Sequence, residues 1–130
     1  MTYHPIVRRR ILVVDDNQDA AELLQQLLEL FEFDVRIALN GAEALDIAPT
    51  FHPEATCSDL DMPVLSGFQL ASALRKSEYS VNTCLIAMTG LNTEENYSLA
   101  IKSGFDVCLV KPFNIDVLVA ELRMYFAKIP

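Results

Sequence analysis

The feature that most constrains this chain is a regular alternation between short apolar runs and longer segments with helical periodicity. Residues 11–16 (ILVVDD) form a β-branched run that ends in acids, and residues 20–31 carry leucines at three- and four-residue spacing. The first pattern is typical of a buried strand and the second of an amphipathic helix. The same pairing recurs along the rest of the chain. Further strands are predicted at residues 34–39, 54–59, 82–90 and 106–110, and further helices at residues 40–48, 67–77, 93–104 and 114–129.

Local signals support several of these boundaries. Thr93 is a candidate N-cap that is followed by glutamates, and Gly104 is a candidate stop for the same helix. Asn114 is a candidate N-cap for the last helix. Pro49 and Pro53 are expected to bracket a loop after the second helix.

Five strands that alternate with five helices predict an α/β fold. Such chains form a parallel sheet with right-handed crossovers and helices on both faces, a doubly wound arrangement, and one common strand order for five strands is 2-1-3-4-5. A length of 130 residues suits one domain. We therefore expect a single domain over residues 1–130, with residues 1–9 as a lead-in whose arginines precede the first strand.

Composition narrows the classes of function. No segment approaches the ~20 apolar residues of a membrane span, and the start of the chain lacks the apolar core of a secretory signal, so we expect a cytoplasmic protein without membrane contact. The net charge of −8 argues against direct binding of nucleic acid. Cys57, Cys84 and Cys108 lie far apart without a C-x-x-C pair, which favours buried free thiols over a disulfide or zinc site.

Polar residues follow four of the five predicted strands at the point where ligands of parallel sheets bind. They are Asp15 and Asp16, Asp59, Thr89, and Lys111. Three converging carboxylates repel one another unless a cation compensates, and hard oxygen ligands suit Mg²⁺. With the metal and the lysine ammonium present, such a site accepts a phosphoryl group, and a carboxylate can act as the nucleophile.

With these residues in view, the chain resembles the receiver domain of two-component response regulators, a flavodoxin-like fold, over nearly its whole length. The resemblance depends on VVDDN (13–17), SDLDMPVLSG (58–67), AMTG (87–90) and GFDVCLVKPF (104–113), which stand in the family's order and spacing.

The resemblance implies a role for each residue of the metal and acceptor site. Asp59 would be the phosphoacceptor. Asp16 and Asp59 would bind Mg²⁺ through their side chains, the backbone carbonyl of Asp61 would add a ligand, and Asp15 would hold a metal-bound water.

The resemblance also implies a response to phosphorylation. Lys111 would contact the phosphoryl oxygens, and Thr89 would hydrogen-bond to them and draw its loop inward. The bond between Lys111 and Pro112 would be cis, as is typical of the family.

The function implied is a phosphorylation-dependent signalling switch, a regulator that assists its own Mg²⁺-dependent phosphotransfer and dephosphorylation but is not an enzyme. The partners would be a sensor histidine kinase or histidine phosphotransfer protein and a downstream protein target. A stand-alone receiver is expected over a domain excised from a longer regulator or hybrid kinase.

Two residues depart from the family pattern. Cys108 stands where the family usually carries an aromatic residue three positions before the lysine, so coupling would run through backbone shifts over the fourth helix, fifth strand and fifth helix. A redox role for Cys108 is a minor alternative, because a mid-strand thiol is usually buried. The Asp61 side chain lies near the site and could alter the lifetime of a phosphoryl group, in a direction that the sequence does not give.

Rival interpretations remain. One is a degenerate receiver that binds proteins without phosphorylation, and the presence of all five site residues argues against it. The other is a haloacid dehalogenase-type phosphatase, whose D-x-D motif is present from Asp59 to Asp61 but follows the third strand instead of the first. A phosphohistidine is disfavoured, because His4 lies in a tail and His52 in a proline-flanked loop.

Overall fold

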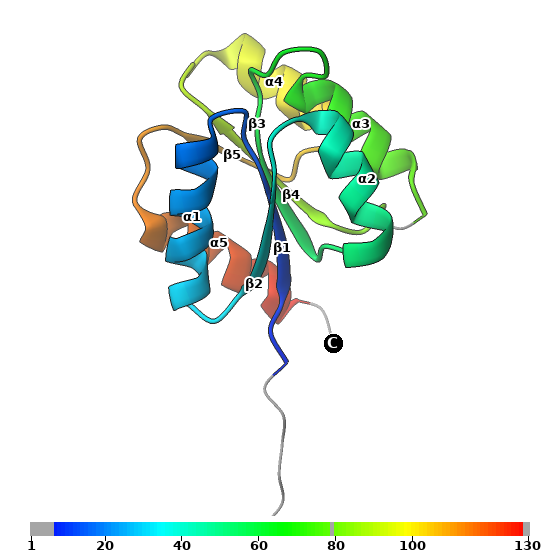
Figure 1. Cartoon of the computed structure of the whole chain (residues 1–130). Helices are drawn as coiled ribbons and strands as arrows, with labels where there is room; N and C mark the ends of the chain where they lie inside the picture. The colour runs from blue at the N-terminus through cyan, green and yellow to red at the C-terminus, as the bar shows by residue number, and fades with distance from the viewer. Residues whose placement is uncertain (1–6, 79, 129–130) are drawn as a thin grey trace, which may run out of the picture.

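The computed structural model describes residues 7–78 and 80–128 and contains one five-stranded parallel sheet. The strand order is β2-β1-β3-β4-β5, which confirms the predicted α/β architecture (Figure 1). The strands are β1 (Arg10–Val14), β2 (Asp34–Ala38), β3 (Ala55–Asp59), β4 (Cys84–Thr89) and β5 (Val107–Val110).

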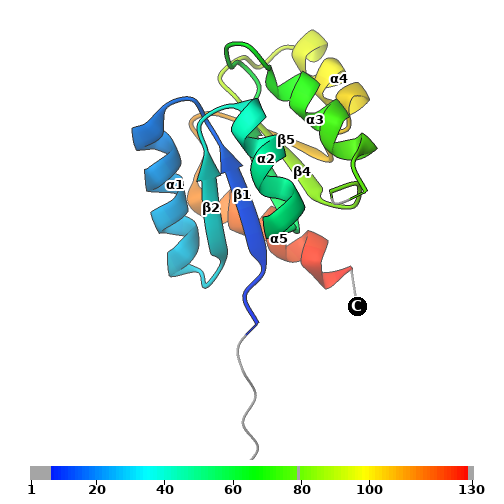
Figure 2. The ribbon, with the colours of Figure 1, turned by 45° about the vertical axis from the view of Figure 1, so that its right-hand side comes forward.

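Five helices cover the two faces of the sheet. α1 and α5 lie on one face, and α2, α3 and α4 lie on the other (Figures 1 and 2). None of the helices among the described residues is long and apolar enough to cross a membrane. The helices are α1 (Gln18–Leu30), α2 (Gly41–Phe51), α3 (Gly67–Lys76), α4 (Glu94–Ser103) and α5 (Ile115–Ala127).

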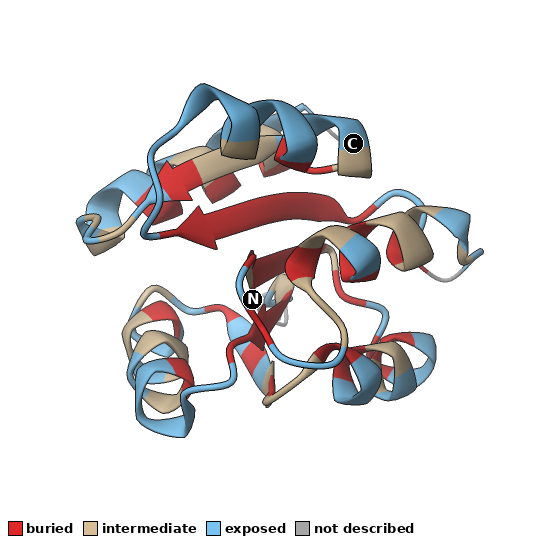
Figure 3. Ribbon diagram, turned by 90° about the horizontal axis from the view of Figure 1, so that it is seen from above, coloured by how far each residue is buried: buried red, intermediate tan, exposed pale blue. Residues whose placement is uncertain are grey.

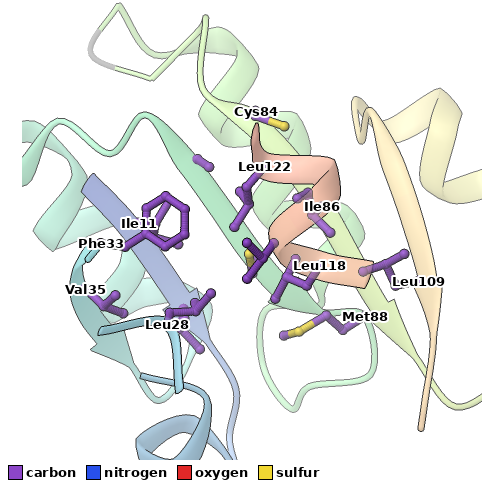
Figure 4. Close-up of a cluster of buried hydrophobic side chains, with 14 of the residues drawn as sticks. Ile11, Leu28, Phe33, Val35, Cys84, Ile86, Met88, Leu109, Leu118 and Leu122 are labelled. Carbon is purple, nitrogen blue, oxygen red and sulfur yellow. The ribbon is translucent and has the colours of Figure 1, made fainter. Parts of the chain in front are cut away.

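The two faces of the sheet form two separate apolar cores. Alternate residues of a strand point to opposite faces, so Ile11 and Val13 pack in the core beneath α1 and α5, while Leu12 and Val14 pack in the core beneath the other three helices. β4 is buried along its whole length, and β1 and β3 are buried except at Arg10 and Asp59 (Figure 3). Figure 4 shows the first core, where Leu118 and other α5 side chains meet the sheet. The rigid sheet therefore fixes the positions of the strand ends.

Most helix boundaries follow from capping side chains. Thr93 accepts a hydrogen bond from the Asn96 backbone N–H, Asn114 accepts one from the Asp116 N–H, and Gly104 ends α4 in the left-handed conformation, as predicted. Ser66 starts α3 with a capping box.

The predicted end of the second helix is wrong. The helix continues through Pro49 to Phe51, although proline has no N–H to donate to the preceding turn. Phe51 is buried, and the Arg36 guanidinium lies 4.8 Å from its ring centroid. His52 closes the turn by donating its N–H to the Ala48 carbonyl with a left-handed backbone. Burial of the aromatic ring therefore outweighs the missing hydrogen bond.

Charged residues at the amino ends of the strands are paired. Arg9 and Arg10, which lead into and begin β1, form salt bridges with Glu54 at 2.7 and 3.5 Å. Arg75, in the last turn of α3, forms a salt bridge with Asp106 at 2.8 Å. Its guanidinium also donates to the carbonyls of Val81, Thr83 and Gly104. The amino end of the sheet is thus held by paired charges.

Candidate functional site

Three carboxylates converge at the carboxyl ends of the two central strands. Asp15 and Asp16 follow β1, and Asp59 is the last residue of β3. The pairing of Val14 with Ser58 brings these strand ends side by side. One carboxylate oxygen from each of the three residues lies within 4.8 Å of the others. Asp15 is buried, Asp59 is partly buried and Asp16 is exposed, so the cluster opens to solvent on one side.

Lys111 brings a positive charge to the same point from the end of β5. Its Nζ lies 3.5 Å from an Asp59 oxygen and 3.6 Å from an Asp15 oxygen. The Lys111 backbone N–H donates to the Thr89 carbonyl at 2.7 Å, and the following peptide bond to Pro112 is cis, as the resemblance implied. The lysine is therefore anchored by its main chain while its ammonium faces two carboxylates.

The electrostatics of the cluster favour binding of a cation. Burial raises the pKa of the Asp59 carboxyl above its ordinary value, the Lys111 ammonium lowers it, and the Asp15 carboxylate raises it again. The net direction is upward, because the lysine does not offset the loss of hydration and the negative neighbour. The Lys111 ammonium contacts Asp15 and Asp59, and Asp16 adds a third carboxylate to the cluster, so the negative charge exceeds the positive charge and favours a further cation.

The donor set also fits a magnesium ion. Opposite oxygens around octahedral Mg²⁺ are about 4.2 Å apart, twice the usual metal–oxygen distance. One oxygen from each of Asp15, Asp16 and Asp59 lies within 4.8 Å of the others, so hard oxygen donors gather around a space of about the size of one such ion.

The segment from Leu60 to Gly67 wraps closely around the phosphoacceptor candidate. The Gly67 N–H donates to the Leu60 carbonyl at 3.0 Å, and the Asp61 backbone hydrogen-bonds to the Asp59 carboxylate. A Cβ at Gly67 would collide with the Asp59 carbonyl and lie 2.7 Å from the Leu60 Cα. Gly67 is thus required by close backbone approach. The Asp61 side chain is exposed, and its backbone lies next to Asp59.

Thr89 ends β4 and is buried, as expected for a residue at this rim. Its hydroxyl oxygen accepts hydrogen bonds from the Leu91 N–H and from the Asn96 side-chain amide, each at 3.0 Å. Asn96 was missed by the sequence reasoning. The only sequence signal was its place in the first turn of the helix that Thr93 caps.

Two hollows flank the site. One, of about 520 Å³, has apolar walls from α1 and Phe113 and reaches Asp15 and Lys111. The other, of about 530 Å³, lies between the loops that follow β3 and β4 and is lined by Asp61, Thr89 and Asn96 among others. A partner can therefore approach the acidic cluster along an apolar surface.

The thiols are free but not all buried. Cys57 and Cys84 are buried, and burial raises the pKa of the Cys84 thiol to about 12. Cys108 is only half-buried, so the prediction of three buried thiols is wrong for this residue. It lies on the four-residue strand β5, and the neighbouring helix α4 buries only Ala100. Partial burial still raises its pKa, which disfavours a reactive thiolate.

Comparison with known proteins identifies the family. A family model described as the response regulator receiver domain matches residues 11–123. The chain belongs to the response regulator receiver domain family. The receiver is 37% identical to the transcriptional regulatory protein PrrA of Mycobacterium leprae over 114 residues, which cover 88% of this chain and 48% of that protein.

Solved receiver domains share the fold. The Francisella response regulator 1452 receiver domain is 32% identical, with a TM-score of 0.86, and the match covers 95% of this chain and 100% of that one. The receiver domain of sensor histidine kinase PA1611 from Pseudomonas aeruginosa, described with a magnesium ion in its active-site cleft, is 23% identical, with a TM-score of 0.85 and coverage of 93% and 99%. This second likeness shows the fold alone.

The chain spans about half the length of curated relatives such as PrrA. Since PrrA is named as a transcriptional regulator, the predicted absence of nucleic-acid contact is not supported for the whole protein. The net charge of −8 belongs to these 130 residues alone.

Proposed function

We propose that the receiver is a phosphorylation-dependent switch in which Asp59 accepts a phosphoryl group from a phosphohistidine. The observation that carries this proposal is the convergence of Asp15, Asp16 and Asp59 with Lys111 at one end of the sheet. The donor would be a sensor histidine kinase or a histidine phosphotransfer protein. The output would be altered binding of a downstream protein.

Asp59 would be the nucleophile among these carboxylates. In the proposed step an Asp59 carboxylate oxygen bonds to phosphorus while the phosphorus–nitrogen bond breaks, and the imidazole of the donor keeps the electron pair. Lys111, 3.5 Å from Asp59, is placed to face the phosphoryl oxygens. In a transfer of this kind, positioning and charge neutralisation supply most of the catalysis.

Asp16 and Asp59 would hold Mg²⁺ through their side chains, and Asp61 through its backbone carbonyl. Asp15 would orient a metal-bound water, and its carboxylate is held by the Asn17 N–H at 3.0 Å. The metal, when bound, neutralises charge on the phosphoryl oxygens. The clustering of the three carboxylates and the excess of negative charge support this assignment.

Phosphorylation would then shift an existing equilibrium between two conformations. Thr89 would donate its hydroxyl hydrogen to a phosphoryl oxygen, and its movement would pull on the loop that leads to α4. Because Cys108 replaces the usual aromatic residue, no ring can turn inward there. The change would reach the surface of α4, β5 and α5 through the backbone.

A degenerate receiver is the alternative. The assembly of all five site residues favours a phosphoacceptor. The phosphatase interpretation is disfavoured because the D-x-D segment lies at the end of β3, whereas the dehalogenase motif follows the first strand.

Intact-protein mass spectrometry after incubation with acetyl phosphate tests the proposal. We expect a Mg²⁺-dependent gain of one phosphoryl mass, abolished by Asp59→Asn and retained by Asp61→Asn, a matched change two residues away. No gain in the unmodified sequence would overturn the proposed function and favour the degenerate receiver.

Binding of a partner tests the role of the lysine separately. Lys111→Ala should uncouple phosphorylation from any change in partner affinity. A variant that is phosphorylated and still gains affinity would contradict the role proposed for Lys111.

A further inference from the structure

Two hydrogen bonds hold the Thr89 hydroxyl next to the start of α4. Its oxygen has two acceptor sites and one hydrogen to donate. Both acceptor sites are used, by the Leu91 N–H and by the Asn96 Nδ2, each at 3.0 Å. The hydroxyl hydrogen is therefore the group left to serve an anion.

Asn96 connects three points of the loop between β4 and α4. Its side-chain amide donates to the Thr89 hydroxyl and also to the Leu91 carbonyl at 3.2 Å. Its backbone N–H donates to the Thr93 hydroxyl, the N-cap of α4. A side chain in the first turn of α4 thus fixes both the hydroxyl and the loop that must move with it.

We infer that Asn96 is a positioning residue that holds Thr89 in its resting place and so sets how readily the site responds to a phosphoryl group. The inference depends on the proposed phosphoryl-accepting function. In the proposed switch Thr89 moves toward Asp59 on β3, and this movement would draw its hydroxyl away from Asn96 on α4. The resting contact and the phosphoryl contact therefore compete for one side chain.

The strength of the competition follows from one hydrogen bond. A net hydrogen bond in a protein shifts an equilibrium by about two- to tenfold. Asn96→Ala should therefore tighten binding of a phosphoryl analogue at Asp59 by about that factor. A residue with a merely structural role would leave this affinity unchanged or weaken it when removed.

The test uses beryllium fluoride with Mg²⁺ as the phosphoryl analogue, titrated and followed by fluorine NMR. Asn92→Ala is the matched control, because Asn92 lies exposed in the same loop. We expect tighter binding for Asn96→Ala, no change for Asn92→Ala, and no effect of Asn96→Ala when Thr89→Ala is already present. Unchanged or weaker binding for Asn96→Ala would overturn the inference.

A change of charge at the same position should act in the opposite direction. In Asn96→Asp the new carboxylate can only accept, so the Thr89 hydroxyl would donate its hydrogen there and lose it for the phosphoryl group. Binding should weaken more than in Asn92→Asp, which adds the same charge to the same loop. Equal effects of the two variants would contradict the assigned contact.

Hydrogen exchange of the Leu91 amide tests the resting contact without any phosphoryl analogue. Asn96→Ala should speed this exchange, because the hydroxyl that accepts the Leu91 N–H loses its second support. If exchange responds but the unmodified sequence binds no beryllium fluoride, the proposed function fails while the resting contact stands. If binding occurs but neither exchange nor affinity responds, the inference fails and the proposed function stands.

Discussion

The two ends of the sheet use the same kinds of charged residue to opposite effect. At the amino end, Arg75 is matched by carbonyl oxygens and by Asp106, and Glu54 is shared between two arginines. At the carboxyl end, three carboxylates cluster and only the Lys111 ammonium, which contacts two of them, opposes their charge. Paired charges hold the fold together, whereas the excess of negative charge at the carboxyl end leaves a demand that a cation can meet. The contrast separates residues for stability from residues for function.

The largest expected effect on stability comes from removing the charge pairing at the amino end of the sheet. Arg75→Met removes a guanidinium that serves three carbonyls and one carboxylate, and should lower the free energy of unfolding by about 2–4 kcal/mol. Urea denaturation measures this, with the exposed neighbour Lys76→Met as control. A loss no larger than that of the control would contradict the assigned role. Phosphorylation of the folded variant should be retained.

A second change tests how closely the carboxyl end is packed. Gly67→Ala places a methyl group against the Asp59 carbonyl and the Leu60 Cα, and should cost about 1–3 kcal/mol of stability. It should also slow phosphorylation, because the collision displaces the acceptor residue itself. Gly90→Ala is the control, since a Cβ there meets no atom within 4 Å. Equal behaviour of the two alanine variants in denaturation and labelling would refute the close approach.

A third change removes one negative charge from the carboxylate cluster and leaves the packing unchanged. Asp59→Asn should stabilise the metal-free fold, because burial and Asp15 penalise the ionised carboxyl in the folded state. Thermal denaturation with EDTA and with Mg²⁺ measures it. The unmodified sequence should gain stability from Mg²⁺ and the variant should gain less. A variant that is less stable than the unmodified sequence in EDTA would show that the charges at this end are balanced.

The smallest effect concerns the thiols between the two ends. The folded state raises the pKa of Cys84 from 9.0 to about 12, so unfolded thiols ionise first and stability should fall as pH rises above 9. The loss at pH 9 is about 0.4 kcal/mol for each such thiol. Alkylation at this pH, located by peptide mass spectrometry, should reach half-buried Cys108 before Cys57 and Cys84. Equal rates at all three would contradict the assigned burial.

The parts of the fold that repeat a pattern were the parts that could be predicted. Alternating strands and helices led to the strand order, and the polar residues after the strands led to the cluster around Asp59. The end of α2 could not be read from Pro49, because the burial of Phe51 is a tertiary effect. Asn96 was equally hidden, since its contact with Thr89 depends on how the loop folds back onto the helix.

The pairing of β1 with β3 has a consequence for how the chain folds. It pairs Ile11 with Ala55, a wider gap in the chain than the other strand pairs span, for example Arg10 with Asp34 or Ile86 with Val107. Strands that are far apart in the sequence pair slowly, because the chain loses conformational entropy on closing the loop before the stabilising contacts form. This pairing also brings Asp15 and Asp16 to Asp59. The site should consequently gain affinity for a divalent cation only once β1 and β3 have paired, so cation binding can report on that step of folding.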